Sequence, residues 1–312
     1  MQLSKQAGSV EHFVIKDIEN PEIKENEVLI SIKAISINPV DFKARLLEDL
    51  LNSLNEAERP AIIGWDIFGA IVAIGNNVTK FEIGDNVFGM INFPGSGKAD
   101  DEFVAAPENQ LAKIPKNISF NEAAATTLAA LTALQTLKPR VKKGDRVLIH
   151  GGSGGVGHFA IQIAKSLGAY VISTSSAKNK SFILSLGADE HIDYNSQKFE
   201  EILTDVDFVL DVFNGDILLN SIKVTKKGGT IISLPAADFS DEILKLAKER
   251  NVDVSFTVVQ SNGDDMNTLK NMLESEAIKP HISKTFAFEK MGDAHLHLEI
   301  GRTLGKVIVT MK

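Results

Sequence analysis

The chain has 312 residues, 44% of them hydrophobic, and a formal net charge of −8. This length allows one large core or two ordinary ones, and we expect two lobes. The acidic balance provides no basic field for nucleic-acid phosphates, and no apolar stretch is long enough to span a bilayer. We therefore expect a soluble, cytoplasmic protein with no nucleic-acid or membrane partner.

The chain contains no cysteine, which excludes disulfides, thiol nucleophiles and every zinc site built on thiolates. Seven histidines remain as possible metal ligands. None forms the i, i+4 pair that places two imidazoles on one face of a helix with an acid between them. We expect no metal site.

The first part of the chain, to about residue 118, is rich in predicted strands. Apolar and β-branched runs at 27–37, 68–75 and 86–91 predict strands, and one amphipathic helix is expected around 42–54. This pattern favours a compact, barrel-like β lobe. The largely apolar run 123–137 predicts a helix that leads into the second lobe.

From Asp145 onward, predicted strands alternate with helices. Six strands are expected, at 146–150, 169–174, 191–193, 207–211, 229–234 and 252–258. Six strands in such an alternation predict a doubly wound parallel sheet. Beyond about residue 260 we expect a helix, an extended segment, a second helix and a last strand, at 266–275, 282–288, 290–301 and 306–311.

A glycine-rich turn follows the first of these six strands. Gly152, Gly154 and Gly157 match G-x-G-x-x-G, whose glycines allow a tight turn, close approach of a pyrophosphate and close packing of helix on strand. An amphipathic helix that ends at Gly168 and a second strand complete the β-α-β unit. We therefore predict a dinucleotide site that includes Gly152, Ser153, Gly154, Gly155, Val156 and Gly157.

The same residues also fit a competing pattern. Gly151 to Gly155 obey G-x-S-x-G, the nucleophile elbow of α/β-hydrolases, with Ser153 as nucleophile. Asp211 and one of three histidines could complete a triad, namely His281, His295 or His297. The elbow gives no role to Gly157, and the preceding chain is not α/β. A P-loop is excluded, because residues 95–99 lack its leading glycine and its hydroxyl.

Several blocks of the chain, in order and spacing, resemble one known family along nearly the full length. They are residues 38–45, 64–69 with Gly75, 81–87, 120–125 with 131–133, the glycine turn, 210–211 with Gly215, 228–229 and 301–307. The family is the zinc-independent, zeta-crystallin-like quinone oxidoreductases of the medium-chain dehydrogenase/reductase superfamily. The chain departs from the family pattern at 98–103, where acids replace bulky and small residues, and in its longer segment 46–60.

The resemblance implies an α/β protein of two domains. Residues 1–120 and 259–312 would form a β-rich, GroES-like catalytic domain, and residues 121–258 a Rossmann cofactor domain inserted between them. It also implies a homodimer joined through the sheet edge of the cofactor domain, which would cover an exposed strand.

The end of the second strand predicts the choice of cofactor. An acid usually stands there to bind the ribose 2′-hydroxyl of NAD, but this chain has Ser175 and Ser176, followed by Lys178 and Lys180. Hydroxyls and cations favour a 2′-phosphate, so we predict NADPH. The alternative is that both lysines belong to a solvated helical turn. The resemblance adds further residues that border the cofactor, namely Thr132, Tyr194, Phe213, Leu234, Val258 and Lys306.

The resemblance predicts hydride transfer from NADPH to a quinone or to the β-carbon of an α,β-unsaturated carbonyl. A developing oxyanion needs donors, for which we nominate Asn38 and Lys43, with Asp41 and Arg45 as a supporting pair. The alternatives are that Asn38 only ends a strand, that Lys43 is solvated and that water supplies the proton. A non-catalytic NADPH-binding or redox-sensing protein is the second functional hypothesis.

Overall fold

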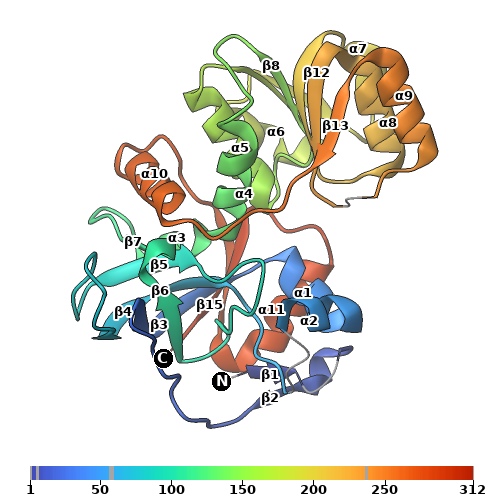
Figure 1. The fold of residues 1–312 in the computed structure, drawn as a ribbon. Coiled ribbons are helices and arrows are strands. Elements are labelled where there is room, and N and C mark those ends of the chain that lie inside the picture. The colour runs from blue at the N-terminus through green and yellow to red at the C-terminus, as the bar shows by residue number, and fades with distance from the viewer. Residues whose placement is uncertain (1, 5–6, 56–59, 236–237, 312) are drawn as a thin grey trace. The chain divides into compact units, whose positions relative to one another are not determined.

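The computed structural model covers residues 1–312 and describes 2–4, 7–55, 60–235 and 238–311, without the side chains of 2–4 and 55. The chain divides into two compact units (Figure 1). One joins Met1–Leu131 to Val259–Lys312, and the other is Thr132–Val258. The expected first boundary, 120–121, falls within helix α3 (Phe120–Ala125), which packs on strands of the first unit.

The first unit is built on a seven-stranded, mostly antiparallel sheet. Its strands in spatial order are β14 (Ile282–Ala287), β15 (Lys306–Thr310), β3 (Glu27–Ile37), β4 (Asp66–Ile74), β5 (Asn86–Met90) and β7 (Ala112–Lys113), with β6 (Phe103–Pro107) paired to β3. A separate pair joins β1 (Gln2–Ser4) and β2 (Phe13–Ile15). The final strand β15 runs antiparallel to β3 with Val307 opposite Ile37. This pairing places Lys306 next to the residue after β3, Asn38.

Two predicted helices of this region are each broken in two. The expected helix at 42–54 is α1 (Pro39–Leu46) and α2 (Glu48–Asn55), separated by Leu47 in an extended conformation. The expected helix at 123–137 is α3 and α4 (Leu128–Leu137). Apolar periodicity did not reveal the second break because it depends on hydroxyls, with Thr126 Oγ1 donating to Glu122 O and Thr127 Oγ1 to Ala124 O, both at 2.8 Å.

The remaining helical elements of the first unit are α10 (Gly263–Glu274), α11 (Met291–Glu299) and the short turns η1 (Val10–His12), η2 (Glu108–Gln110) and η4 (Phe288–Lys290). The predicted order after residue 260, helix, strand, helix, strand, is present as α10, β14, α11 and β15. The apolar faces of β3, β4 and β15 pack with Met291 and Ala294 of α11 in one buried cluster.

The second unit is a six-stranded parallel sheet in the order β10-β9-β8-β11-β12-β13. The strands are β8 (Arg146–Ile149), β9 (Tyr170–Ser175), β10 (Glu190–Asp193), β11 (Val206–Asp211), β12 (Thr225–Ser233) and β13 (Asp253–Phe256). All six predicted strands are present, and the α/β fold class with a doubly wound sheet is confirmed. Between β8 and β11 the chain reverses its direction of winding.

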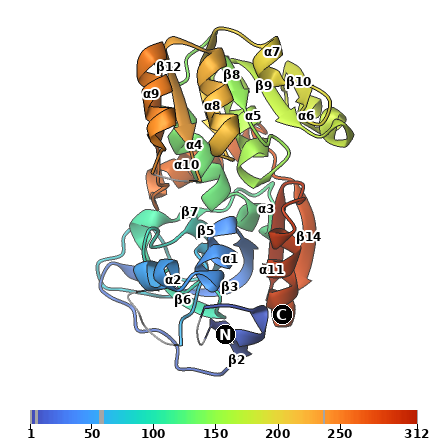
Figure 2. The same cartoon turned by 90° about the vertical axis from the view of Figure 1, so that its right-hand side faces the viewer.

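Helices connect these strands along both faces of the sheet. They are α5 (Gly155–Ser166), η3 (Ala177–Asn179), α6 (Lys180–Ser185), α7 (Phe199–Ile202), α8 (Gly215–Val224) and α9 (Asp241–Arg250). Leu218 of α8 and Ile243 of α9 share one buried cluster with Leu148 and Val209 of the sheet. Figure 2 shows α8 and α9 side by side on this face. Because the strands are parallel, their carboxyl ends share one edge of the sheet.

In the described segments of the chain, no helix is both long enough and apolar enough to cross a membrane.

Candidate functional site

The glycine turn of the second unit connects β8 to α5. Gly151 adopts φ +63°, the amide of Gly152 donates to Thr174 O at 3.1 Å, and the amide of Gly154 donates to Gly151 O at 2.9 Å. Gly154 is the N-cap of α5 and has no side chain with which to cap it. The first-turn amides, those of Gly155, Val156 and Gly157, therefore have no partner within the helix and can receive a phosphate at the positive end of the helix dipole.

Two motif glycines are required by close packing. A Cβ on Gly157 would lie against the carbonyl oxygen of Gly151 and 2.7 Å from Gly152 Cα. A Cβ on Gly152 would overlap Ser173 Oγ of β9. Helix α5 can therefore approach the turn this closely only without side chains at these positions.

Most predicted cofactor residues lie at the carboxyl edge of the sheet, beside this turn. Ser175 ends β9, Tyr194 follows β10, Phe213 follows β11, Leu234 follows β12 and Val258 lies after β13. Tyr194 and Phe213 are 60% and 52% exposed. Six parallel strands thus bring together residues spread over more than half of the second unit's sequence.

The residues predicted to bind the 2′-phosphate lie in the segment after β9. Ser176 is the N-cap of η3, and Lys178 and Lys180 are exposed. Asn179 between them donates to Ser153 Oγ at 3.0 Å, which ties this segment to the glycine turn. Ser175 is buried, and its Oγ lies 2.9 Å from His191 Nε2.

His191 was not nominated from the sequence. Burial and the neighbouring Lys180 lower its pKa, and Asp193 opposes this shift. Its position in β10 beside β9 follows from the strand order, which no local pattern gives.

The contacts of Ser153 and Asp211, both among the described residues, are not those of the triad that the hydrolase alternative requires. Ser153 is bonded to Asn179. Asp211 is buried and accepts from Ser233 Oγ at 2.8 Å and from the amides of Phe213 and Asn214 at 3.1 and 3.0 Å. It therefore shapes the loop that presents Phe213. His295 is fully buried in the first unit, edge-on to Phe13.

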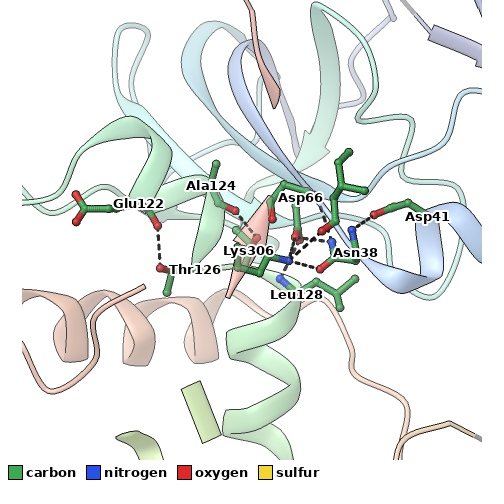
Figure 3. A network of polar contacts seen from close by, with 11 residues as sticks. Asn38, Asp41, Asp66, Glu122, Ala124, Thr126, Leu128 and Lys306 are labelled. Atoms are coloured by element: carbon green, nitrogen blue, oxygen red, sulfur yellow. Dashed lines mark hydrogen bonds and ion pairs between the residues drawn. The ribbon is translucent and has the colours of Figure 1, made fainter. Parts of the chain in front are cut away.

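Of the remaining nominated cofactor residues, Thr132 lies on α4 and is 7% exposed. Lys306 lies in the first unit, where it joins a buried polar network with Asn38 and Asp66 (Figure 3). Lys306 Nζ donates to Asn38 Oδ1 and lies 3.9 Å from Asp66 Oδ2. Asp66 also accepts from Asn38 Nδ2 at 2.7 Å and, through Oδ1, from the amide of Leu128 at 2.8 Å. All three residues are at most 2% exposed.

This network fixes the orientation of Asn38. Its Nδ2 donates to Asp66 Oδ2 and to Ser36 O, the latter at 3.2 Å, and its Oδ1 accepts from Lys306. Both amide hydrogens are therefore engaged within the protein. The arrangement therefore favours a positioning role for Asn38, in which it orients Lys306. It does not favour the predicted role, in which Asn38 contacts a substrate carbonyl directly.

Asp66 was not nominated from the sequence, although it belongs to the 64–69 block. It is an acid at the start of an otherwise apolar strand, followed by Ile67 and Phe68. That pattern is a usable signal, because a charge is rarely buried without a partner. Its partner, Lys306, was known only as a cofactor contact implied by resemblance.

The expected Asp41–Arg45 pair does not form. Asp41 lies in the first turn of α1 and accepts from the backbone amide of Asn38, the N-cap. Arg45 is buried but bonds to Gly8 O and to Glu299 of α11. Lys43 is exposed on α1. The two members of the predicted pair differ in partner because long-range contacts, not their spacing along the helix, decide what each side chain meets.

The buried ionisable groups shift the pKa values of one another. Burial is the largest cause that lowers the pKa of Lys306, and Asp66 and Asp41 oppose it. Burial raises the pKa of Asp41 to about 8, and the charge of Asp66 adds to the rise, whereas the Asn38 amide and Lys306 oppose it. The site therefore holds a cation among acids that compete for protons.

Replacing Asp41 with Asn is expected to reduce the fall in stability as pH rises. Because the folded pKa of about 8 exceeds the ordinary 3.8, the folded state binds more protons between these values. The free energy of unfolding then decreases with rising pH across this window. Urea unfolding of the wild type and of Asp41→Asn at several pH values measures the difference. Parallel pH profiles would contradict the assignment.

Comparisons with known proteins agree with this architecture. The family model of the alcohol dehydrogenase GroES-like domain matches residues 24–116, and that of a zinc-binding dehydrogenase matches residues 186–309. The 2-methylene-furan-3-one reductase of Solanum lycopersicum is 36% identical, over 97% of this chain and 76% of that protein. The chloroplastic NADPH-dependent alkenal/one oxidoreductase of Arabidopsis thaliana is 32% identical, over 93% and 73%.

Among solved structures, the quinone oxidoreductase from Coxiella burnetii has a TM-score of 0.91 and 33% identity, over 100% of this chain and 98% of that one. The β-rich unit and the inserted parallel sheet with its glycine turn define a medium-chain dehydrogenase/reductase. Within that superfamily, the chain belongs to the quinone oxidoreductases, the branch that its sequence resembles.

One matching family model is named for zinc, but the described residues of this chain do not fit that metal. Zinc in proteins takes three or four ligands from Cys, His, Asp or Glu. The chain has no cysteine, and within the described ranges no three of His, Asp and Glu gather closely enough to hold a metal ion. The polar network of the first unit already contains a cation, because the ammonium of Lys306 lies between Asn38 and Asp66.

Proposed function

We propose that this protein is an NADPH-dependent oxidoreductase that reduces a quinone or the double bond of an α,β-unsaturated carbonyl compound. The observation that carries this proposal is the glycine turn, whose amides can receive a dinucleotide phosphate beside a strand that ends in Ser175 and is followed by Ser176. The names of relatives, an alkenal/one oxidoreductase and a 2-methylene-furan-3-one reductase among them, support the substrate class.

The cofactor would be bound by the carboxyl edge of the parallel sheet. The amides of the turn would receive the pyrophosphate, and Ser176, Lys178 and Lys180 the 2′-phosphate. Tyr194, Phe213, Leu234 and Val258 would border the rest of the cofactor. The bound cofactor supplies the hydride, so the protein must bind, orient and exclude water.

Within the first unit, we propose that Lys306 stabilises the oxyanion that develops on the substrate. Its ammonium is the cation of the buried network, and Asn38 Oδ1 and Asp66 fix its direction. Reduction adds a hydride to one atom of the acceptor and a proton to another, and Lys306 can hold that proton at Nζ. Asn38, Asp41 and Asp66 would position Lys306 and tune its charge. The structure gives Lys43 and Arg45 no contact with this network.

The test is an NADPH oxidation assay with a panel of quinones and enones. The purified protein is expected to consume NADPH only when an acceptor is added, and more efficiently than NADH. The double change Lys178→Glu and Lys180→Glu should remove the preference, because carboxylates repel a 2′-phosphate. Binding of NADPH without turnover on any acceptor would favour the redox-sensing alternative. Ester cleavage that Ser153→Ala abolishes would favour the hydrolase.

The assembly and the location follow from the same proposal. We propose a homodimer joined along β13, an edge strand of the parallel sheet whose residues after Asp253 are only half-buried. Light scattering at the peak of a size-exclusion column tests this, and a monomer mass would refute it. The acidic net charge agrees with a cytoplasmic location, which a fluorescent fusion checks.

A further inference from the structure

A chain of buried side-chain hydrogen bonds lies directly under the glycine turn. His150, the residue between β8 and Gly151, is 1% exposed. Its Nδ1 lies 3.1 Å from Thr174 Oγ1, and its Nε2 lies 2.9 Å from Ser221 Oγ. The chain therefore joins the end of β8 to β9 on one side and to α8 on the other.

One tautomer of His150 satisfies every bond in this chain. Ser221 Oγ donates to the carbonyl of Ile217 at 2.8 Å, which uses its single hydrogen, and it then accepts from His150 Nε2–H. The neutral imidazole then has an acceptor at Nδ1, which Thr174 Oγ1–H satisfies. The Thr174 oxygen is left to accept from the amide of Gly151, at 3.3 Å. Burial supports the neutral form, because it lowers the pKa of His150 to about 3.

The end of this chain meets the backbone that the cofactor requires. Thr174 holds two successive amides, since its Oγ1 accepts from Gly151 and its carbonyl accepts from Gly152 at 3.1 Å. Gly151 has φ +63°, a conformation that turns the chain from the strand toward α5. If the Thr174 hydroxyl turned its hydrogen toward the Gly151 amide, this bond would be lost, and an acceptor at His150 Nδ1 keeps the hydrogen directed away from the amide.

We propose that His150 and Thr174 are positioning residues for cofactor binding: His150, neutral and protonated at Nε2, orients the Thr174 hydroxyl, which holds the first peptide of the glycine turn. The inference rests on the proposed binding of NADPH at this turn. It assigns a role to a buried histidine that lies directly under the glycine turn.

The experiment compares isosteric and conservative variants. Thr174→Val removes the hydroxyl while keeping the shape, and Thr174→Ser keeps the hydroxyl. His150→Leu removes both ring nitrogens, and His150→Gln offers an acceptor and a donor in the same order. Thr225→Val is the matched control, because Thr225 is equally buried in the same unit and its Oγ1 donates to the backbone carbonyl of Ser221, not to the side-chain atoms of the His150 chain.

Thr174→Val and His150→Leu are expected to weaken NADPH binding about tenfold, measured by fluorescence titration, and to raise KM for NADPH. The kcat at saturating NADPH should stay within about twofold, because no group that touches the acceptor has changed. Thr174→Ser and His150→Gln should restore most of the affinity. Thr225→Val should lower the melting temperature and leave the NADPH affinity unchanged.

Two results would overturn the inference alone. One is wild-type NADPH affinity in Thr174→Val. The other is an equal loss of affinity in Thr225→Val, which would show that any loss of stability in this unit weakens binding. A wild-type protein that binds no NADPH would overturn the proposed function, and this inference with it.

Discussion

Gly157→Ala is expected to abolish tight NADPH binding, with a loss of affinity of at least about 100-fold, equivalent to roughly 2.8 kcal/mol. A Cβ at this position would lie against Gly151 O and 2.7 Å from Gly152 Cα, so α5 and the turn must move apart. The same strain should lower the free energy of unfolding by about 1–3 kcal/mol. Calorimetric titration with NADPH and a urea unfolding curve measure the two effects.

The variant Gly154→Ala distinguishes the effect of packing strain from the effect of a side chain at the cofactor site. Gly154 has a φ of −82°, which any residue tolerates, and a Cβ there would meet only Gly151 O, at 3.3 Å. This variant should therefore keep nearly wild-type stability while losing affinity, because the backbone at the second motif glycine must approach the pyrophosphate. Wild-type NADPH affinity in Gly157→Ala would contradict the assignment of the turn as the cofactor site.

Lys306→Met is expected to lower kcat/KM by about 10²–10³, the usual effect of removing one group that stabilises an oxyanion. It should also destabilise the protein by about 3–5 kcal/mol, since Asp66 is left buried without its cation. Steady-state kinetics and unfolding curves measure the two losses. The stability loss alone would follow from a purely structural Lys306, so a second variant is required.

The double variant Lys306→Met with Asp66→Asn distinguishes a catalytic Lys306 from a purely structural one. Removing both charges should recover much of the lost stability, because no unpaired ion remains in the interior. Activity should not recover, since the cation is still missing. A double variant with wild-type kcat/KM would show that Lys306 acts only in packing and ion pairing. Asp41→Asn with Lys306 intact indicates how strongly the second acid tunes the reaction.

Local patterns were sufficient wherever the physical cause was local. The glycine spacing, the apolar stripe of α5 and the β-branched runs each depend on neighbours within a few residues, and the six strands of the second unit appear where they were predicted. The serines at and after the end of β9 could be located because the motif has a typical spacing between the glycine turn and the end of the second strand. The breaks at Leu47 and at Thr126 could not, since they depend on backbone geometry and hydroxyl bonds that apolar periodicity does not register.

The sequence by itself determined that this protein has a β-α-β unit with a glycine turn, no thiol chemistry and a second strand without the acid that NAD prefers. Only the tertiary structure decided which polar groups meet. Lys306 lies 268 positions from Asn38 along the chain, and Arg45 lies 254 from Glu299. Strand pairing and core packing create such contacts, and because they depend on the whole fold, residue spacing alone cannot specify them.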